Sequence, residues 1–199
     1  MLTDIAKTYS AVFAPELFVL LCSVLLIGFE WHRDSARSSA GLTARFAVLG
    51  LGWGVAFAIY QGVPLAVETV PEWGVDATGS AGLGIGVLVI WFVWRRRNWG
   101  AIVPEYALLL VAATVPHLLV TPFWDISSHV LYALVPAGYL LFVDRRFVPL
   151  FAVAVGMVFA RPLAGAHTWL QSVGGVALSV VLLLAVSRLE SSANGGGVR

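Results

Sequence analysis

Long apolar runs separated by short polar segments make up most of the chain between residues 13 and 186. A helix that crosses the roughly 30 Å hydrocarbon core of a bilayer needs about 20 mostly apolar residues. The pattern therefore predicts an all-α, polytopic transmembrane helical bundle of about seven spans, with six as the alternative count. The expected spans run approximately from Phe13 to Phe29, Phe46 to Val67, Ser80 to Trp94, Pro104 to Val120, Ser128 to Val143, Phe147 to Ala160 and Thr168 to Val186.

These spans leave little chain for anything else, so residues 1–190 are expected to form a single integral membrane domain. The run Asn194-Gly195-Gly196-Gly197 predicts that residues 191–199 are a flexible cytoplasmic tail. The first ten residues lack the basic segment and small-residue cleavage site of a signal peptide, so we expect the first span to be retained. The second span contains four glycines, which favour close packing against another helix: Gly50, Gly52, Gly54 and Gly62.

Composition supports a membrane protein and excludes several other classes. Hydrophobic residues make up 59% of the 199 residues and charged residues only 12%, against about 25% charged in soluble domains. A soluble domain, a disordered chain and a nucleic-acid-binding protein are therefore excluded, and membrane lipids are the expected partners. Cys22 is the only cysteine, which excludes an intrachain disulfide and a cysteine metal cluster.

The charged residues predict an orientation. With seven spans, Lys7 and Arg161 are the only basic residues on one side, which also carries Asp4, Glu16, Glu68, Glu72, Asp76 and Asp125. Ten arginines fall on the other side: Arg33, Arg37, Arg45, Arg95, Arg96, Arg97, Arg145, Arg146, Arg188 and Arg199. Because basic loops stay in the cytoplasm, we expect a multi-pass protein of the cell membrane. Its N-terminus would lie outside and its C-terminus in the cytoplasm.

Arg161 is the one arginine on the expected outer side, and other reactive side chains are close to it in sequence. Five residues separate it from His167, and Gln171 lies one helical turn beyond His167. On the same side, Ser127 and Ser128 precede His129 at the start of the fifth span. Helix N-termini bind anions, arginine binds phosphate oxygens with two parallel donors, and histidine can act as nucleophile or acid. Singly, Arg161 is typical of an arginine near a helix end and each histidine of an interfacial residue, but together they indicate a phosphoryl-transfer site.

The segment Arg161–Gly175 resembles the third signature of the type-2 phosphatidic acid phosphatase superfamily. That signature reads Ser-Arg, five residues, His, three residues, Asp, and often a Gly-Gly pair, here Gly174-Gly175. The segment 126–129, Ile-Ser-Ser-His, resembles the second signature, Pro-Ser-Gly-His. The resemblance covers roughly residues 122–180. It implies that Arg161 and the serines bind the phosphate, His167 attacks phosphorus and His129 protonates the leaving oxygen.

The chain departs from this family at several places, including Ile126 for proline and Ser128 for glycine in the second signature. Ala160 stands where the family has serine, and Gln171 stands where the aspartate would orient His167. The first signature, Lys, six residues, Arg-Pro, has no counterpart on the outer side. His117 is the one side chain there that could partly replace its cations. The segment Asp125–Leu134 also resembles, more weakly, the opening of VanZ-like membrane proteins.

These patterns predict a membrane-embedded phosphatase or phosphotransferase that acts on a lipid phosphate or diphosphate. The catalytic residues would be His167, His129 and Gln171, and the substrate-binding residues Arg161, Ser127, Ser128 and His117. The expected chemistry needs no metal and no cofactor. The missing first signature and Gln171 leave an alternative open, a catalytically inactive membrane scaffold or binding protein of the same fold.

Overall fold

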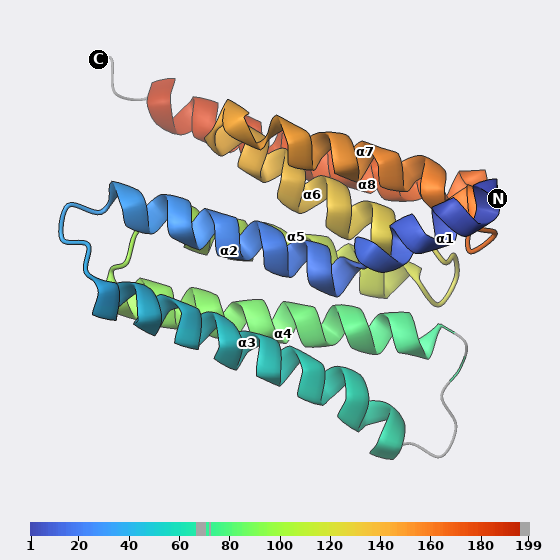
Figure 1. Cartoon of the computed structure of the whole chain (residues 1–199), viewed down its shortest axis with the longest axis horizontal. Helices are drawn as coiled ribbons and strands as arrows, with labels where there is room; N and C mark the ends of the chain where they lie inside the picture. Colours follow the sequence, from blue (N-terminus) through green and yellow to red (C-terminus); the bar gives the residue numbers. More distant parts are fainter. Residues whose placement is uncertain (67–70, 72, 196–199) are drawn as a thin grey trace.

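A computed structural model describes residues 1–66, 71 and 73–195 of the chain, and all regular elements of this part are helices. The predicted all-α bundle is therefore confirmed (Figure 1). The helices are α1 Leu2–Val12, α2 Pro15–Arg33, α3 Ser39–Ala66, α4 Gly74–Arg97, α5 Ile102–Val120, α6 Ser128–Val143, the 3₁₀ helix η1 Arg145–Phe147, α7 Val148–Leu163 and α8 Trp169–Gly195.

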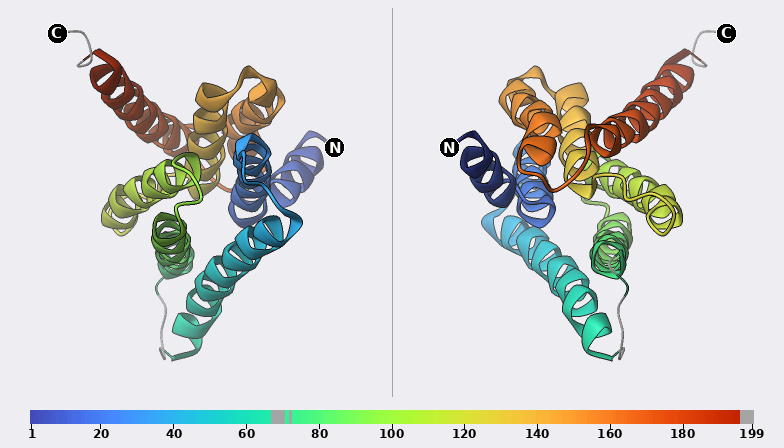
Figure 2. Two further views of the ribbon diagram at one scale, coloured as in Figure 1. Left: turned by 90° about the vertical axis from the view of Figure 1, so that its left-hand side faces the viewer. Right: turned by 90° about the vertical axis from the view of Figure 1, so that its right-hand side faces the viewer.

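A helix occupies each of the seven expected apolar spans, and six helical segments are long and apolar enough to cross a membrane. The exception is α6, whose 16 residues extend only about 24 Å at 1.5 Å per residue. This helix is the centre of the bundle: 12 of its 16 residues are buried, and it packs against α2, α5, α7 and α8 (Figure 2). Because neighbouring helices surround α6, its length does not have to match the thickness of the hydrocarbon core.

From α2 to α8 the successive α-helices alternate in direction, so the connections between them gather at two ends of the bundle (Figure 1). We call one the site end; it holds the N-terminus and the segments 121–127 and 164–168. The other, the basic end, holds the segments 34–38 and 98–101 and the C-terminus. Helix α8 continues to Gly195, into the segment expected to be a tail, whereas residues 196–199, Glu68 and Glu72 lie outside the described residues.

Helix α1 is an element that the apolar pattern does not predict. Its 11 residues are too few to cross a membrane, and Asp4 and Lys7 interrupt its apolar character. The helix instead packs against α7, where the Tyr9 hydroxyl donates a hydrogen bond of 2.7 Å to the carbonyl of Val153. Gly156 leaves the space that the Tyr9 ring occupies. Contacts with α7 therefore hold α1 in place, although the apolar pattern of α1 itself predicts no helix.

Small residues let α3 and α4 approach closely. A Cβ atom on Gly52 would lie 2.7 Å from the carbonyl oxygen of Gly86, and a Cβ on Gly82 would meet the backbone of Ala56. Such spacings permit backbone-to-backbone packing that any larger residue would prevent. The expectation for the glycines of the second span thus holds for Gly52 alone. A Cβ on any of the other three would meet nothing within 4 Å: Gly50, Gly54 and Gly62.

At the basic end a buried carboxylate caps the start of α5. Glu30 is 5% exposed, and its Oε1 accepts hydrogen bonds from the backbone N–H of Ile102 at 2.8 Å and of Val103 at 3.4 Å. Its Oε2 accepts a bond of 2.8 Å from the Trp94 indole. A carboxylate at a helix N-terminus satisfies free N–H groups and offsets the positive end of the helix dipole. Glu30 therefore ties α2, α4 and α5 together.

The α3–α4 contact gives a direct stability test. We expect Gly52→Leu to lower the free energy of unfolding by about 1–3 kcal/mol, because the added side chain must push the α4 backbone away. Gly50→Leu is the matched control, since it adds the same side chain to the same helix in open space. Thermal unfolding of both variants in detergent measures the difference. Equal midpoints for the two variants would contradict close packing at Gly52.

Candidate functional site

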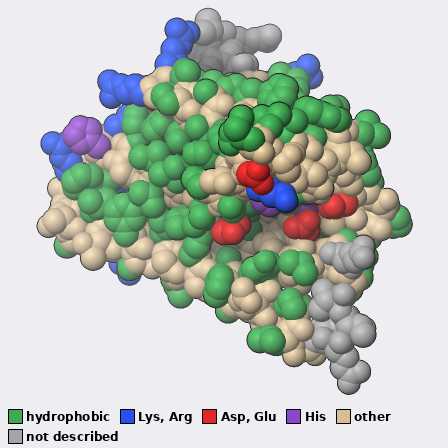
Figure 3. All heavy atoms as spheres, turned by 45° about the vertical axis from the view of Figure 1, so that its right-hand side comes forward, with side chains coloured by type: hydrophobic (Ala, Val, Ile, Leu, Met, Phe, Trp, Pro, Cys, Tyr) green, Lys and Arg blue, Asp and Glu red, His purple; other side chains and the backbone are tan. Residues whose placement is uncertain are grey.

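Charged side chains and histidines gather in a hollow at the site end, surrounded by hydrophobic side chains (Figure 3). They come from segments that are distant in sequence. Asp76 lies in the first turn of α4, Asp125 precedes α6, and His129 is in the first turn of α6. Arg161 lies in the last turn of α7, and His167 lies between α7 and α8. The fold therefore brings both predicted signature segments to one end of the bundle.

The closest contact in this group joins Arg161 to His167. The Nε and Nη2 atoms of Arg161 lie 3.3 and 3.1 Å from Nδ1 of His167. The turn after α7 creates this contact, because Gly165 adopts φ +72°, in the left-handed region that favours glycine, and ends the helix. Arginine can only donate, so Nδ1 accepts. The proton of a neutral His167 ring must then be on Nε2.

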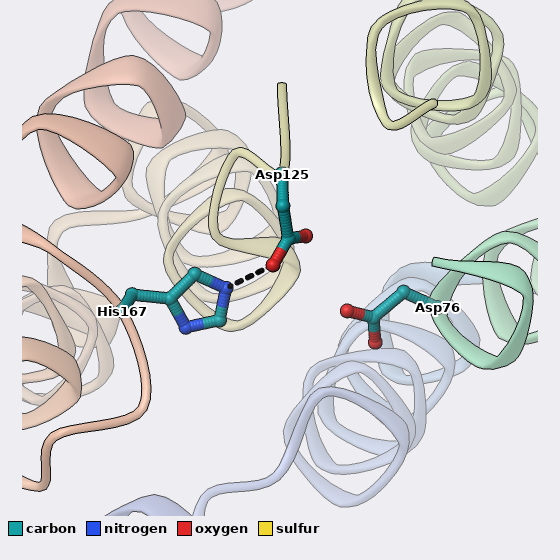
Figure 4. Close-up of side chains that lie close together, drawn as sticks. All are labelled: Asp76, Asp125 and His167. Carbon is teal, nitrogen blue, oxygen red and sulfur yellow. Dashed lines mark ion pairs between the residues drawn. The ribbon is translucent and has the colours of Figure 1, made fainter. Parts of the chain in front are cut away.

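The Nε2 atom of His167 faces Asp125, whose Oδ2 is 3.5 Å away (Figure 4). The His167 side chain is 3% exposed and that of Asp125 is 43% exposed. Burial, reinforced by the charge of Arg161, lowers the pKa of His167 to about 4, although Asp76 acts in the opposite direction. Burial raises the pKa of Asp125, and the charges of His117 and Arg161 oppose this shift. At neutral pH His167 is therefore a neutral ring held between a guanidinium and a carboxyl group.

The carboxyl group of Asp76, in the first turn of α4, is directed towards Asp125 and His167 (Figure 4). Ligand atoms of Asp76, Asp125 and His167 all lie within 4.8 Å of one another, close enough to hold a metal ion after small adjustments. Arg161 acts against this interpretation, because its hydrogen bonds occupy Nδ1 and keep the proton on Nε2. The ring thus presents an N–H to the two carboxyl groups, where a metal would need a lone pair. We interpret the group as a hydrogen-bonded charge cluster.

A cavity of about 270 Å³ lies beside this cluster. Its polar wall contains Ser128, His129 and Asp76, and its apolar wall includes Trp53 and Phe57. His129 is close enough to Arg161 and His167 for their charges to act on its ring. Its buried Nδ1 atom has no hydrogen-bond partner among the described residues. His129 is therefore the predicted catalytic side chain that both lines the cavity and has a free ring nitrogen.

Ser127 lies at the N-terminus of α6, where its hydroxyl accepts a hydrogen bond of 3.4 Å from the backbone N–H of Val130. Its own N–H donates to the carbonyl of Gln171 at 3.2 Å, which joins the segment before α6 to the start of α8. Ser127 is fully buried. In this arrangement its side chain is a helix cap, whereas the neighbouring Ser128 reaches the cavity.

Gln171 does not contact His167 in the way that the sequence predicts. Its Oε1 accepts a bond of 2.7 Å from the backbone N–H of Thr168, and its N–H donates to the Thr168 hydroxyl at 3.2 Å. This reciprocal pair is a capping box at the start of α8. The expectation that the Gln171 side chain orients His167 is thus corrected. Thr168 and Gln171 have the spacing of a capping box, and the Gln171 side chain binds the backbone of Thr168. Asp125 occupies the position beside the ring instead.

His117 lies deeper in the bundle than the cavity wall. It is fully buried, and its Nδ1 pairs with the Ser80 hydroxyl at 3.0 Å. The Thr121 hydroxyl is 3.4 Å from the same nitrogen. The residues that line the cavity do not include His117, although the charges of Asp76 and Asp125 act on its ring. His117 therefore joins α4 to α5 and does not replace the missing cations of the first signature.

Comparisons with models of protein families, with curated proteins and with solved structures find no match to this chain. The resemblance to the phosphatase superfamily accordingly rests on the two short segments and on where they lie. Asp76 and Asp125, which sequence reasoning placed only on the acidic outer side, join the cluster through the fold. The sequence signals for Asp125 are its position four residues before His129 and the weaker resemblance of the segment Asp125–Leu134 to VanZ-like proteins.

Titration tests the environment of His167. We expect its ring, followed by NMR in detergent, to titrate near pH 4, and Arg161→Gln to raise this pKa because a neighbouring positive charge is removed. Arg37→Gln, at the basic end, is the matched control and should leave the pKa of His167 unchanged.

An unfolded histidine takes up its proton near pH 6.5. The stability contributed by the neutral ring is therefore complete above about pH 6.5 and declines as the pH falls towards 4. Titration of His167 near pH 6.5 in the folded protein would contradict its burial.

Proposed function

We propose that the protein is a membrane phosphatase or phosphotransferase that acts on the phosphate or diphosphate group of a membrane lipid. His167 is the nucleophile, Arg161 binds the phosphoryl oxygens and His129 protonates the leaving oxygen. The observation that carries the proposal is the contact of Arg161 with His167 beside the N-terminus of α6. A phosphate that takes over the Arg161 donors would bring its phosphorus next to the imidazole.

Charge and shape near this contact support an anionic lipid headgroup. A guanidinium binds two phosphate oxygens at once, and the start of α6 provides the positive end of a helix dipole. Ser128 and His129 lie at that helix end and also line the cavity. The apolar cavity wall, with Trp53 and Phe57, suits the first carbons of a lipid chain. A bound phosphate dianion also favours the protonated form of His129, which the acid step needs.

We infer that the site end faces the outside of the cell and the basic end the cytoplasm. The segment 34–38 with Arg37 and the end of α4 with Arg95, Arg96 and Arg97 lie at the basic end. The positive-inside rule assigns such loops to the cytoplasm. The substrate would then be a lipid phosphate of the outer leaflet of the cell membrane.

A second candidate is a binding protein or scaffold that has lost the chemistry. Carboxyl groups favour it, because Asp76 and Glu16 line the cavity. Asp76 also lies close to Asp125 and His167. Carboxylates repel a phosphate dianion. The two candidates differ in turnover, so an activity measurement separates them.

We expect wild-type protein in lipid vesicles to release inorganic phosphate from a lipid phosphate added to the face of the site end. His167→Ala should abolish release, because the nucleophile is lost. Arg161→Lys should lower it by roughly 10- to 1,000-fold, because an ammonium group cannot form the two parallel hydrogen bonds of a guanidinium. His32→Ala, an exposed histidine at the basic end, is the matched control and should retain full activity. Folded wild-type protein without turnover on lipid monophosphates and diphosphates would favour the scaffold.

A further inference from the structure

The two ring nitrogens of His167 have different partners, and this difference determines which nitrogen can attack. Nδ1 is within 3.1 Å of the Arg161 guanidinium, and Nε2 is 3.5 Å from the Asp125 carboxyl group. Since Arg161 can only donate, the lone pair of the neutral ring is on Nδ1 and the proton is on Nε2. The lone pair therefore points towards the group that binds phosphate.

We propose that Asp125 is the positioning residue of His167 and that phosphate is transferred to Nδ1 of this ring. The inference rests on the proposed function. Asp125 accepts the Nε2 hydrogen, fixes the tautomer and offsets the positive charge that the ring gains when Nδ1 attacks. It performs the role that sequence reasoning assigned to Gln171, which instead caps α8.

Burial supports this assignment. The His167 side chain is 3% exposed, which shields Nε2 from bulk solvent and favours Asp125 as its partner. The Nε2 atom has no other hydrogen-bond partner among the described residues, and Oδ1 of Asp125 is also buried without one. The Nε2 hydrogen is thus available to the Asp125 carboxyl group, and a movement of a few tenths of an ångström would shorten the 3.5 Å between Nε2 and Oδ2 to a normal hydrogen bond.

The reaction then has a defined sequence of bonds. The Nδ1 lone pair forms a bond to phosphorus while the bond from phosphorus to the lipid oxygen breaks, and its electron pair goes to that oxygen. The oxygen takes a proton from His129, and the phosphorylated ring, still carrying its Nε2 proton, is a cation beside Asp125. Water next attacks phosphorus and gives a proton to His129, and the N–P electron pair returns to Nδ1. Phosphate leaves, and His167 and His129 regain their original protonation states.

Three measurements test the proposal. NMR of protein labelled with ¹⁵N-histidine should identify Nε2 as the protonated nitrogen of His167. Turnover of Asp125→Asn should fall by up to about 10⁴-fold, the effect of replacing by an amide the carboxylate that fixes the tautomer of a catalytic histidine, and Asp125→Glu should recover part of it. Phosphohistidine trapped by alkaline quenching should carry phosphate on Nδ1. Asp144→Asn is the matched control, because an amide oxygen there can still accept the bond from the Arg146 N–H.

The outcomes separate this inference from the proposed function. An active protein with phosphate on Nε2, or with full activity in Asp125→Asn, would overturn the role of Asp125 and leave the phosphatase proposal standing. Turnover that survives His167→Ala would overturn both. A wild-type ring protonated on Nδ1 would overturn the assignment of the attacking nitrogen even without an activity measurement.

Discussion

The contact between the segment before α6 and the first turns of α8 determines where the polar side chains of the site end lie. A backbone hydrogen bond of 3.2 Å from Ser127 to Gln171 joins the two segments. Gly174 and Gly175 make the approach possible, since a Cβ on Gly174 would lie 2.8 Å from the Trp124 ring and a Cβ on Gly175 3.0 Å from the Ser127 carbonyl. Through this contact Asp125 and His129 come to lie beside His167, which is 42 and 38 residues away from them in sequence. The capping box at the start of α8 holds the same turn in place.

The cluster that results places one guanidinium and two carboxyl groups around a neutral imidazole. Arg161 donates to His167, and the carboxyl groups of Asp125 and Asp76 lie on the opposite side of the ring. Burying an unpaired guanidinium would be costly, so its contact with the imidazole is stabilising. Under the proposed function a phosphate replaces the imidazole as acceptor for Arg161. The same exchange frees the lone pair of Nδ1, so that substrate binding itself would expose the nucleophile.

Apolar runs predicted the helices well because a membrane helix is defined by its own composition and length. Each expected span from Phe13 to Val186 contains a helix. The apolar pattern did not predict α1, which depends on packing against α7, or the short α6 as the buried centre. The Glu30 cap of α5 also depends on residues from three helices. Such features come from tertiary contacts, which the spacing of apolar residues does not encode.

For the candidate site too, the sequence predicted a contact within one segment but not the contacts between distant segments. Spacing along the chain brought Arg161 and His167 together correctly, because one turn at Gly165 connects them. It misassigned Gln171, since a residue one helical turn after His167 is also three residues after Thr168, where capping is favourable. Asp125 could not be paired with His167 from the sequence, because the α5–α6 segment and the α7–α8 segment meet only in the fold. Long-range contacts of this kind decide whether candidate residues named from the sequence come together in one site.

Orthovanadate, a mimic of phosphate in transfer reactions, tests the central claim most directly. An experimental structure of the protein in lipid with vanadate should place vanadium next to Nδ1 of His167, with the Arg161 guanidinium on the vanadate oxygens and the Asp125 carboxylate on Nε2. In that complex Arg161 would no longer donate to the ring. Vanadate bound away from the site end, or an Arg161–His167 hydrogen bond that persists at saturating vanadate, would contradict the account.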